Sequence, residues 1–195
     1  RQAVAPQGIS TITPPAAAYE RAMERWAEFA RMFSGRSHLS RLNAAAPASK
    51  SSFQTISSGN TKFLTILVQF SDLTFSSANP QNDFFNLLNL DGYAVNGATG
   101  SAWNYFHENS SGIFDPQFDV VGPITLSHNM AYYGANDEDG HDARRKEMVA
   151  EAVDMADQQG VDFSQYDNDG DGYIDNIFIF FAGYNEAEGG PDGSI

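Results

Sequence analysis

The sequence contains no cysteine among its 195 residues. This absence excludes thiol catalysis, disulfide cross-links and cysteine-based zinc sites. There is also no run of 18 apolar residues, so the sequence predicts no membrane-spanning segment. Hydrophobic residues make up 42% of the chain and aromatic residues 13%, which is enough apolar surface for a folded core and excludes wholesale disorder.

Basic residues are scarce, because 11 Lys and Arg stand against 25 Asp and Glu and the formal net charge is −14. Nucleic acids and anionic membranes bind positive surfaces, so neither is expected as a partner. The charge is divided unevenly: residues 1–60 carry a net charge of +4 and residues 61–195 carry −18. This division indicates two segments with different roles.

Residues 1–42 predict a helical segment. Apolar side chains recur every three or four residues and so share one face of an amphipathic helix: Tyr19, Met23, Trp26, Ala30 and Phe33. Residues 43–60 are rich in Ala, Ser, Pro and Gly and predict a linker. One helix and a linker are too short to bury a core. We therefore expect residues 1–60 to dock on the acidic remainder, residues 61–195.

Residues 61–195 alternate between strand and helix patterns. Apolar runs predict strands buried on both faces at residues 63–70 and 177–182, and shorter runs predict a strand pair, or one bent strand, at residues 118–126. Amphipathic patterns predict helices at residues 83–90, 101–109 and 141–159. This order predicts an α/β domain with a mixed, twisted sheet and packed helices.

An Asp-rich loop before the last predicted strand carries the clearest chemical signal. Carboxylates at alternate positions of a loop converge only around a cation, and calcium takes six to eight oxygen ligands, backbone carbonyls among them. The first positions of the loop match the calcium-loop pattern, with Gly172 at the sharp turn. The predicted ligands are the side chains of Asp167, Asp169, Asp171 and Asp175 and the carbonyl of Tyr173.

The match to a calcium-binding EF-hand then ends. Phe178 stands where an EF-hand places a bidentate Glu, and no second loop pairs with this one. The loop therefore predicts a fixed structural calcium ion rather than a calcium sensor. The alternative interpretation is a solvated acidic turn, in which the clustered carboxylates repel one another.

No complete catalytic site is visible in the sequence. The four histidines are His38, His107, His128 and His141, and no two of them stand at the spacing of zinc ligands on a helix. His107-Glu108 begins like a His-Glu-x-x-His motif, but Ser111 stands at its fifth position, so we interpret His107 as an ordinary helix residue. Glu186 and Glu188, directly after the last predicted strand, form either a second cation site or a solvated turn.

Several ungapped blocks from about Lys62 onwards resemble immune-inhibitor-A-type zinc metallopeptidases, peptidase family M six. The blocks are residues 96–106, 114–123, 130–134 and 166–191, the last of which includes the Asp-rich loop. The resemblance implies a secreted or cell-surface bacterial endopeptidase with a metzincin-like N-terminal subdomain at residues 61–195. Residues 1–60 resemble the end of the propeptide that such enzymes carry.

The resemblance also implies a zinc ion held by a His-Glu-x-x-His helix, whose Glu acts as general base on protein or peptide substrates. The chain does not contain that motif, so we expect it to stop short of the zinc helix and to be inactive alone. Of the family's site residues, only the calcium loop carries over. Two hypotheses follow: a portion of a zinc endopeptidase, or a non-catalytic, calcium-stabilised surface or binding domain derived from that fold.

Overall fold

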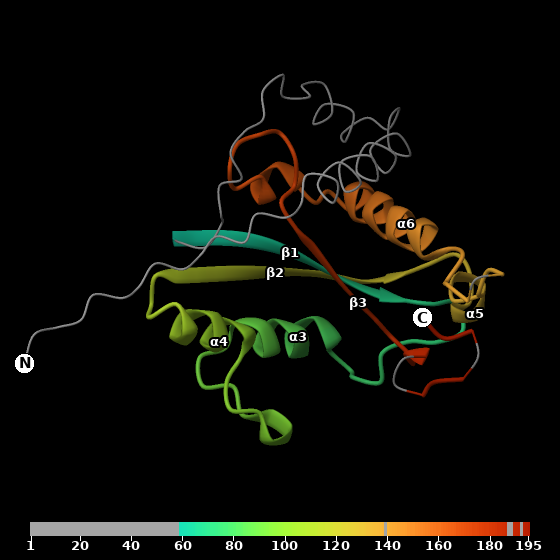
Figure 1. The fold of residues 1–195 in the computed structure, drawn as a ribbon, viewed down its shortest axis with the longest axis horizontal. Coiled ribbons are helices and arrows are strands. Elements are labelled where there is room, and N and C mark those ends of the chain that lie inside the picture. The colour runs from blue at the N-terminus through green and yellow to red at the C-terminus, as the bar shows by residue number, and fades with distance from the viewer. Residues whose placement is uncertain (1–58, 139, 187–188, 192) are drawn as a thin grey trace, which may run out of the picture.

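The computed structural model describes residues 59–138, 140–186, 189–191 and 193–195 (Figure 1). The helical segment predicted for residues 1–42 and the linker up to residue 58 lie outside the described residues, as does Glu188. Strand β1 (Gly59–Gln69) begins four residues before the predicted start at Phe63. It therefore takes up the last two residues of the predicted linker.

A three-stranded sheet forms the centre of the described chain. Its strand order is β2 (Phe114–Thr125), β1, β3 (Ile177–Phe181). β1 pairs in parallel with both neighbours, with Phe63 opposite Phe118 and Leu64 opposite Ile177. The prediction of a mixed sheet is therefore wrong for the described strands. Successive strands are joined through helices rather than hairpins, and such crossovers return the chain in the same direction.

Helices cover both faces of the sheet (Figure 1). α3 (Pro80–Asn89) and α4 (Ala102–Asn109) lie on one face, and α6 (Arg145–Gln158) lies on the other. Short elements complete the chain: η1 (Val95–Gly97), α5 (Met130–Tyr133) and η2 (Phe163–Tyr166). The α/β class predicted from the sequence is confirmed.

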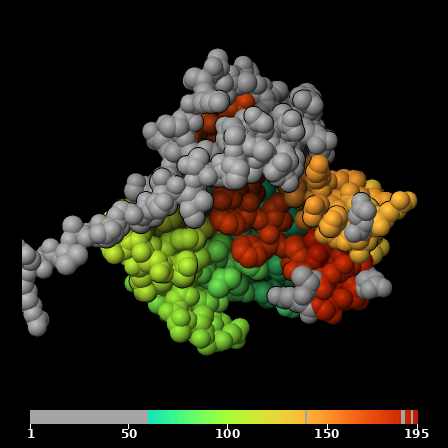
Figure 2. Space-filling view, viewed as in Figure 1, coloured from blue at the N-terminus to red at the C-terminus, as the bar shows by residue number. Residues whose placement is uncertain are grey.

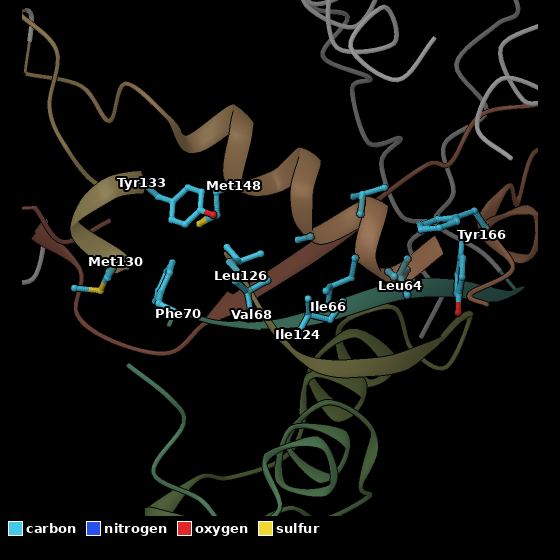
Figure 3. Close-up of a cluster of buried hydrophobic side chains, with 14 residues drawn as sticks. Leu64, Ile66, Val68, Phe70, Ile124, Leu126, Met130, Tyr133, Met148 and Tyr166 are labelled. Carbon is cyan, nitrogen blue, oxygen red and sulfur yellow. The ribbon is translucent and has the colours of Figure 1, made fainter. Parts of the chain in front are cut away.

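Two hydrophobic clusters separate these layers. The larger lies between the sheet and α6 and contains Leu64, Ile66 and Val68 of β1, all with no exposed surface, together with Met148 of α6 (Figure 3). The smaller lies on the α3 side and is largely aromatic around buried Leu67 and Phe118. Because successive side chains of a strand point to opposite faces, β1 supplies both clusters.

β2 is one strand with a bend rather than a strand pair. Its register with β1 shifts between Ile66 and Val68, next to the bend at Gly122 and Pro123. Gly122 has a φ of 101°, and a Cβ atom there would lie 2.6 Å from the carbonyl oxygen of Leu67. Only glycine can therefore bring the bent strand this close to β1.

The starts of α3 and α4 are set by capping side chains, whereas α6 has no side-chain cap. α3 begins at Pro80, three residues before the predicted start, because the Asn79 side chain accepts a hydrogen bond from the amide of Asn82. α4 begins after Ser101, whose hydroxyl forms a capping box with Asn104. α6 begins at Arg145 rather than His141, because Asp142 pairs with Asn136 in an antiparallel bridge just before the helix.

β3 is less buried than its sequence predicts. Its odd-numbered side chains pack on the larger cluster and its even-numbered ones on the smaller, yet all five are only half-buried. Both faces are covered, but β3 lies at one edge of the described sheet, and that edge exposes each side chain. Both faces of β3 are packed as predicted, but the burial of its side chains is only partial. Among the described helices, none is long and apolar enough to cross a membrane.

A matched pair of leucine substitutions tests the central position of β1. Leu64→Ala removes a fully buried side chain and is expected to lower the free energy of unfolding by about 2–5 kcal/mol. Leu90→Ala changes a side chain that is 49% exposed and should alter it by less than about 0.5 kcal/mol. Urea denaturation measures both. Equal losses would contradict a core built on β1.

Candidate metal centre

The Asp-rich loop connects η2 to β3 at the amino-terminal end of that strand. One carboxylate oxygen from each of Asp167, Asp169 and Asp171 lies within 4.8 Å of the other two. Asp167 is half-buried, and the other two are exposed. The structure thus brings together three of the predicted ligands in a set that contains only oxygen donors.

Backbone amides of the turn hold these carboxylates in place. Asp167 accepts hydrogen bonds from the amides of Gly170 (2.8 Å) and Gly172 (2.9 Å). The amide of Tyr173 donates to Asp171 at 2.9 Å. Gly170 and Gly172 have φ values of 74° and 90°, a left-handed conformation that favours glycine. The alternation of Asp and Gly therefore folds the loop back around its own carboxylates.

The carboxylates also affect one another electrostatically. Partial burial raises the pKa of Asp171 above its ordinary value, and the nearby charges of Asp169, Asp167 and Asp175 raise it further. The hydrogen bond from the amide of Tyr173 opposes this rise. A bound divalent cation would reverse the balance, because it favours the ionised form of every carboxylate around it.

Two predicted ligands are placed differently. Asp175 is outside the three-carboxylate cluster, and its side chain accepts hydrogen bonds from the backbone amide (2.7 Å) and the side-chain amide (2.9 Å) of Asn168. The amide of Asp175 donates to the carbonyl of Tyr166, which closes the base of the loop. Tyr173 takes part through its backbone amide. Asp175 thus stabilises the ends of the loop rather than its centre.

Asn168 is the residue that sequence reasoning missed. Its side-chain oxygen accepts a hydrogen bond from the amide of Lys62 at 2.8 Å, and its side-chain nitrogen donates to the Lys62 carbonyl at 3.0 Å. The side chain therefore satisfies the backbone of β1 much as a neighbouring strand would. Because Lys62 is 106 residues away in the chain, no local pattern signals this contact.

A second contact joins the start of the loop to the sheet. The hydroxyl of Tyr166 donates to Asp119 on β2 at 3.2 Å, and the Lys62 ammonium lies 3.4 Å from the same carboxylate. Burial raises the pKa of Tyr166 to about 12, and the charge of Asp119 and the hydrogen bond to it add to the rise. The loop is thereby held against both β1 and β2.

The remaining candidate residues form no further metal site in the described part of the chain. Glu186 accepts hydrogen bonds from the amide of Gly193 (2.8 Å) and from Asn136 (3.3 Å), and so closes the loop after β3. His107 stacks on Trp103, and His128 stacks on Tyr132. Among the described residues, the only cluster suited to a metal is that of Asp167, Asp169 and Asp171.

The parallel sheet between two helical layers and the carboxylate loop define the class of protein: an α/β domain with a candidate cation-binding loop. Residues 50–194 match the family described as "Immune inhibitor A peptidase M6, catalytic domain". The chain therefore belongs to the immune inhibitor A family of M6 peptidases, as the resemblance in its sequence predicts.

One curated relative is Immune inhibitor A of Bacillus thuringiensis subsp. alesti, which is 30% identical to this chain over 103 residues. The aligned region covers 44% of this chain and 15% of that relative. The match thus spans only a small part of the relative's length.

The Tyr166 hydroxyl predicts a dependence of stability on alkaline pH. Folding raises the pKa of Tyr166 from 10.0 to about 12, so the folded state binds the proton more tightly than the unfolded chain. This contribution is complete below pH 10 and is lost as the pH rises towards 12. Between pH 10 and pH 12, the free energy of unfolding should therefore fall less in the Tyr166→Phe variant than in the unchanged protein. Urea titrations measure this free energy.

Tyr105→Phe serves as the control for this measurement, because Tyr105 is 64% exposed on α4. It should leave the pH dependence unchanged. If the free energy of unfolding falls equally steeply with pH in the Tyr166→Phe variant and in the unchanged protein, the hydroxyl does not couple the loop to Asp119.

Proposed function

We propose that this chain is a portion of the catalytic domain of a secreted bacterial metalloendopeptidase that acts on protein or peptide substrates. The observation that carries the proposal is the family match, which covers residues 50–194. The α/β sheet with its two helical layers supports it, because it offers a rigid frame for a catalytic site. We propose that this frame is a metzincin-like subdomain.

The zinc ion of such a peptidase does not fit the residues described here. Zinc in peptidases is bound by histidine nitrogens together with a carboxylate or a further histidine. No cluster of that kind occurs in the described part of the chain, where His107 and His128 are stacked on separate aromatic rings. We therefore assign no catalytic role to any described residue, and the zinc ligands would have to lie outside the described part of the chain.

A structural calcium ion at Asp167, Asp169 and Asp171 is the second part of the proposal. Three observations support a cation at this position. All the donors are oxygens, one oxygen from each carboxylate lies within 4.8 Å of the other two, and the pKa of Asp171 is raised. The carbonyl of Tyr173 and the carboxylate of Asp175 would complete the ligands. Such an ion would stabilise the connection between η2 and β3.

The third part of the proposal concerns residues 1–60. We propose that they act as a pro-segment that docks on residues 61–195 of the same chain. Their net charges of +4 and −18 support an attractive interaction between the two segments. The amphipathic pattern of residues 16–33 supports a helix with one apolar face for that contact.

Removal of calcium should lower the melting temperature. A ligand that binds only the folded state stabilises it by about 2.7 kcal/mol at a concentration 100 times its dissociation constant. We expect EDTA to lower the melting temperature and added calcium to restore it. In the Asp169→Asn variant the response to calcium should shrink, whereas Glu108→Gln, which removes one charge from an exposed position on α4, should leave it intact. Equal responses in both variants would contradict calcium at this loop.

Peptidase activity should require more than these 195 residues. We expect the intact protein encoded by the gene to cleave casein in a zinc-dependent manner, and this chain alone to leave casein uncleaved. Cleavage is measured by the release of acid-soluble peptides, with and without a chelator. Zinc-dependent cleavage by the isolated chain would contradict the expectation that these 195 residues are inactive alone. An intact protein without activity would favour the alternative of a non-catalytic binding domain.

A further inference from the structure

A single carboxylate on α6 holds the connection between β2 and α5. One oxygen of Glu151 accepts hydrogen bonds from the backbone amide (2.7 Å) and the hydroxyl (2.5 Å) of Ser127. The other oxygen accepts from the hydroxyl of Tyr133, which extends from α5 towards α6 beside Met148 (Figure 3). Tyr133 has no exposed surface, so its hydroxyl depends on this partner rather than on solvent. Three donors therefore converge on one side chain.

α5 in turn packs directly on the chain that follows β3. A Cβ atom on Gly183 would lie 2.5 Å from the sulfur of Met130, and one on Gly134 would lie 2.3 Å from the carbonyl oxygen of Ser194. We call residues 183–186, 189–191 and 193–195 the segment after β3. It lies at the surface, next to the residues that lead into α6 (Figure 2). Because these contacts leave no free space, a shift of α5 would displace this segment.

A second link between α6 and α5 lies at the surface. The hydroxyl of Tyr132 donates to the exposed carboxylate of Glu147 at 3.0 Å, and Arg144 donates to the carbonyl of Tyr132 at 2.9 Å. Exposed contacts of this kind contribute little to stability. The buried link through Glu151 is therefore the stronger of the two.

The surroundings of Glu151 favour its ionised form. Burial raises the pKa of Glu151, but the hydrogen bonds from Ser127 and Tyr133 and the charge of protonated His128 outweigh burial and hold the pKa below its ordinary value of 4.5. The contacts are thus complete above pH 4.5 and are lost as the pH falls through the lowered pKa. The other charged and titratable groups on the packed elements are Asp72, Tyr132, Arg144, Glu147 and Glu186.

We infer that Glu151 is an acid-sensitive latch. While its carboxylate is ionised, it holds Ser127 and Tyr133, and through α5 it holds the segment after β3 in place. Once protonated, it no longer accepts from three donors with the strength of a charged acceptor, so α5 loosens and the segment is released. The inference goes beyond the proposed peptidase function and does not depend on it, because every contact lies within the described residues.

The test measures hydrogen exchange of the 195-residue chain by mass spectrometry, with rates corrected for the intrinsic effect of pH. Between about pH 6 and pH 3, the protection of amides in residues 126–134 and in the segment after β3 should fall about tenfold, while the protection of β1 is retained. Unchanged protection of the segment, or an equal fall in β1, would overturn the inference.

A matched pair of variants on α6 locates the latch. Glu151→Gln reproduces the shape of the protonated carboxyl group, so the segment after β3 should exchange about tenfold faster at neutral pH and acid should add nothing further. Glu147→Gln removes the exposed carboxylate one turn earlier and should change the exchange less than about twofold. Equal exchange in the two variants would overturn the inference.

Tyr133→Phe gives a second measurement of the same link. It removes one of the three donors and keeps the buried ring, so it should also speed exchange of the segment at neutral pH. No change in this variant would contradict a link through Tyr133.

Two other carboxylates reach the same parts of the chain and need their own controls. Asp72 accepts a hydrogen bond from the amide of Met130 at 3.0 Å, and Glu186 accepts from the amide of Gly193 at 2.8 Å. The acid response should persist in Asp72→Asn and in Glu186→Gln, because both variants retain Glu151. A response that persists in Glu151→Gln and disappears in either of these variants would assign it to that other carboxylate and overturn the inference.

Discussion

The double burial of β1 is the constraint from which the rest of the architecture follows. Leu64, Ile66, Leu67 and Val68 are completely buried, and each such side chain contributes about 1.5–3 kcal/mol through the hydrophobic effect. A strand that is apolar on both faces needs a helical layer on each side and a neighbour at each edge. Parallel neighbours in turn require crossover connections, and those connections supply the helices. The burial of β1 on both faces therefore accounts for the two helical layers, the central position of β1 and the parallel direction of its neighbours.

β3 connects the two features that bear on function. The carboxylate loop precedes the strand and is tied to β1 through Asn168 and Lys62 and to β2 through Tyr166 and Asp119. A hollow of about 520 Å³ lies at the carboxyl end of the strand and is lined by residues 179–181, 183–185 and 189–191. β3 has five residues, packs on both hydrophobic clusters and, among the described strands, pairs with β1 alone. The loop before it and the segment after it also hold it in place, so a cation in the loop would act on the position of the strand.

The parts of the fold that were predictable are those whose signals are local. The apolar run of β1 and the sharp Asp-Gly turn of the loop each act within a few residues, and each was predicted, whereas the Ser101 cap of α4 was not. Strand direction and edge position were not, because an apolar run such as that of β3 is the same in a central strand and in an edge strand whose faces are both covered. Asp175 was predicted as a ligand from its position in the loop, whereas the hydrogen bonds that one of its carboxylate oxygens accepts from Asn168 were not predicted. The role of Asn168 depends on Lys62, which only the folded sheet brings near.

The contrast between the two sheet edges bears on how this domain is used. A strand edge with unpaired backbone groups promotes aggregation, and folded proteins normally block it. Here α3 supplies Asn89 and Gln81 to block β2, so the fold is able to protect an edge where protection is needed. Along β3 the same protein places an apolar strand, outward-facing backbone groups and a walled hollow side by side. Among the described residues, the two edges therefore differ: side chains of α3 occupy the backbone groups of β2, and a hollow lies beside β3.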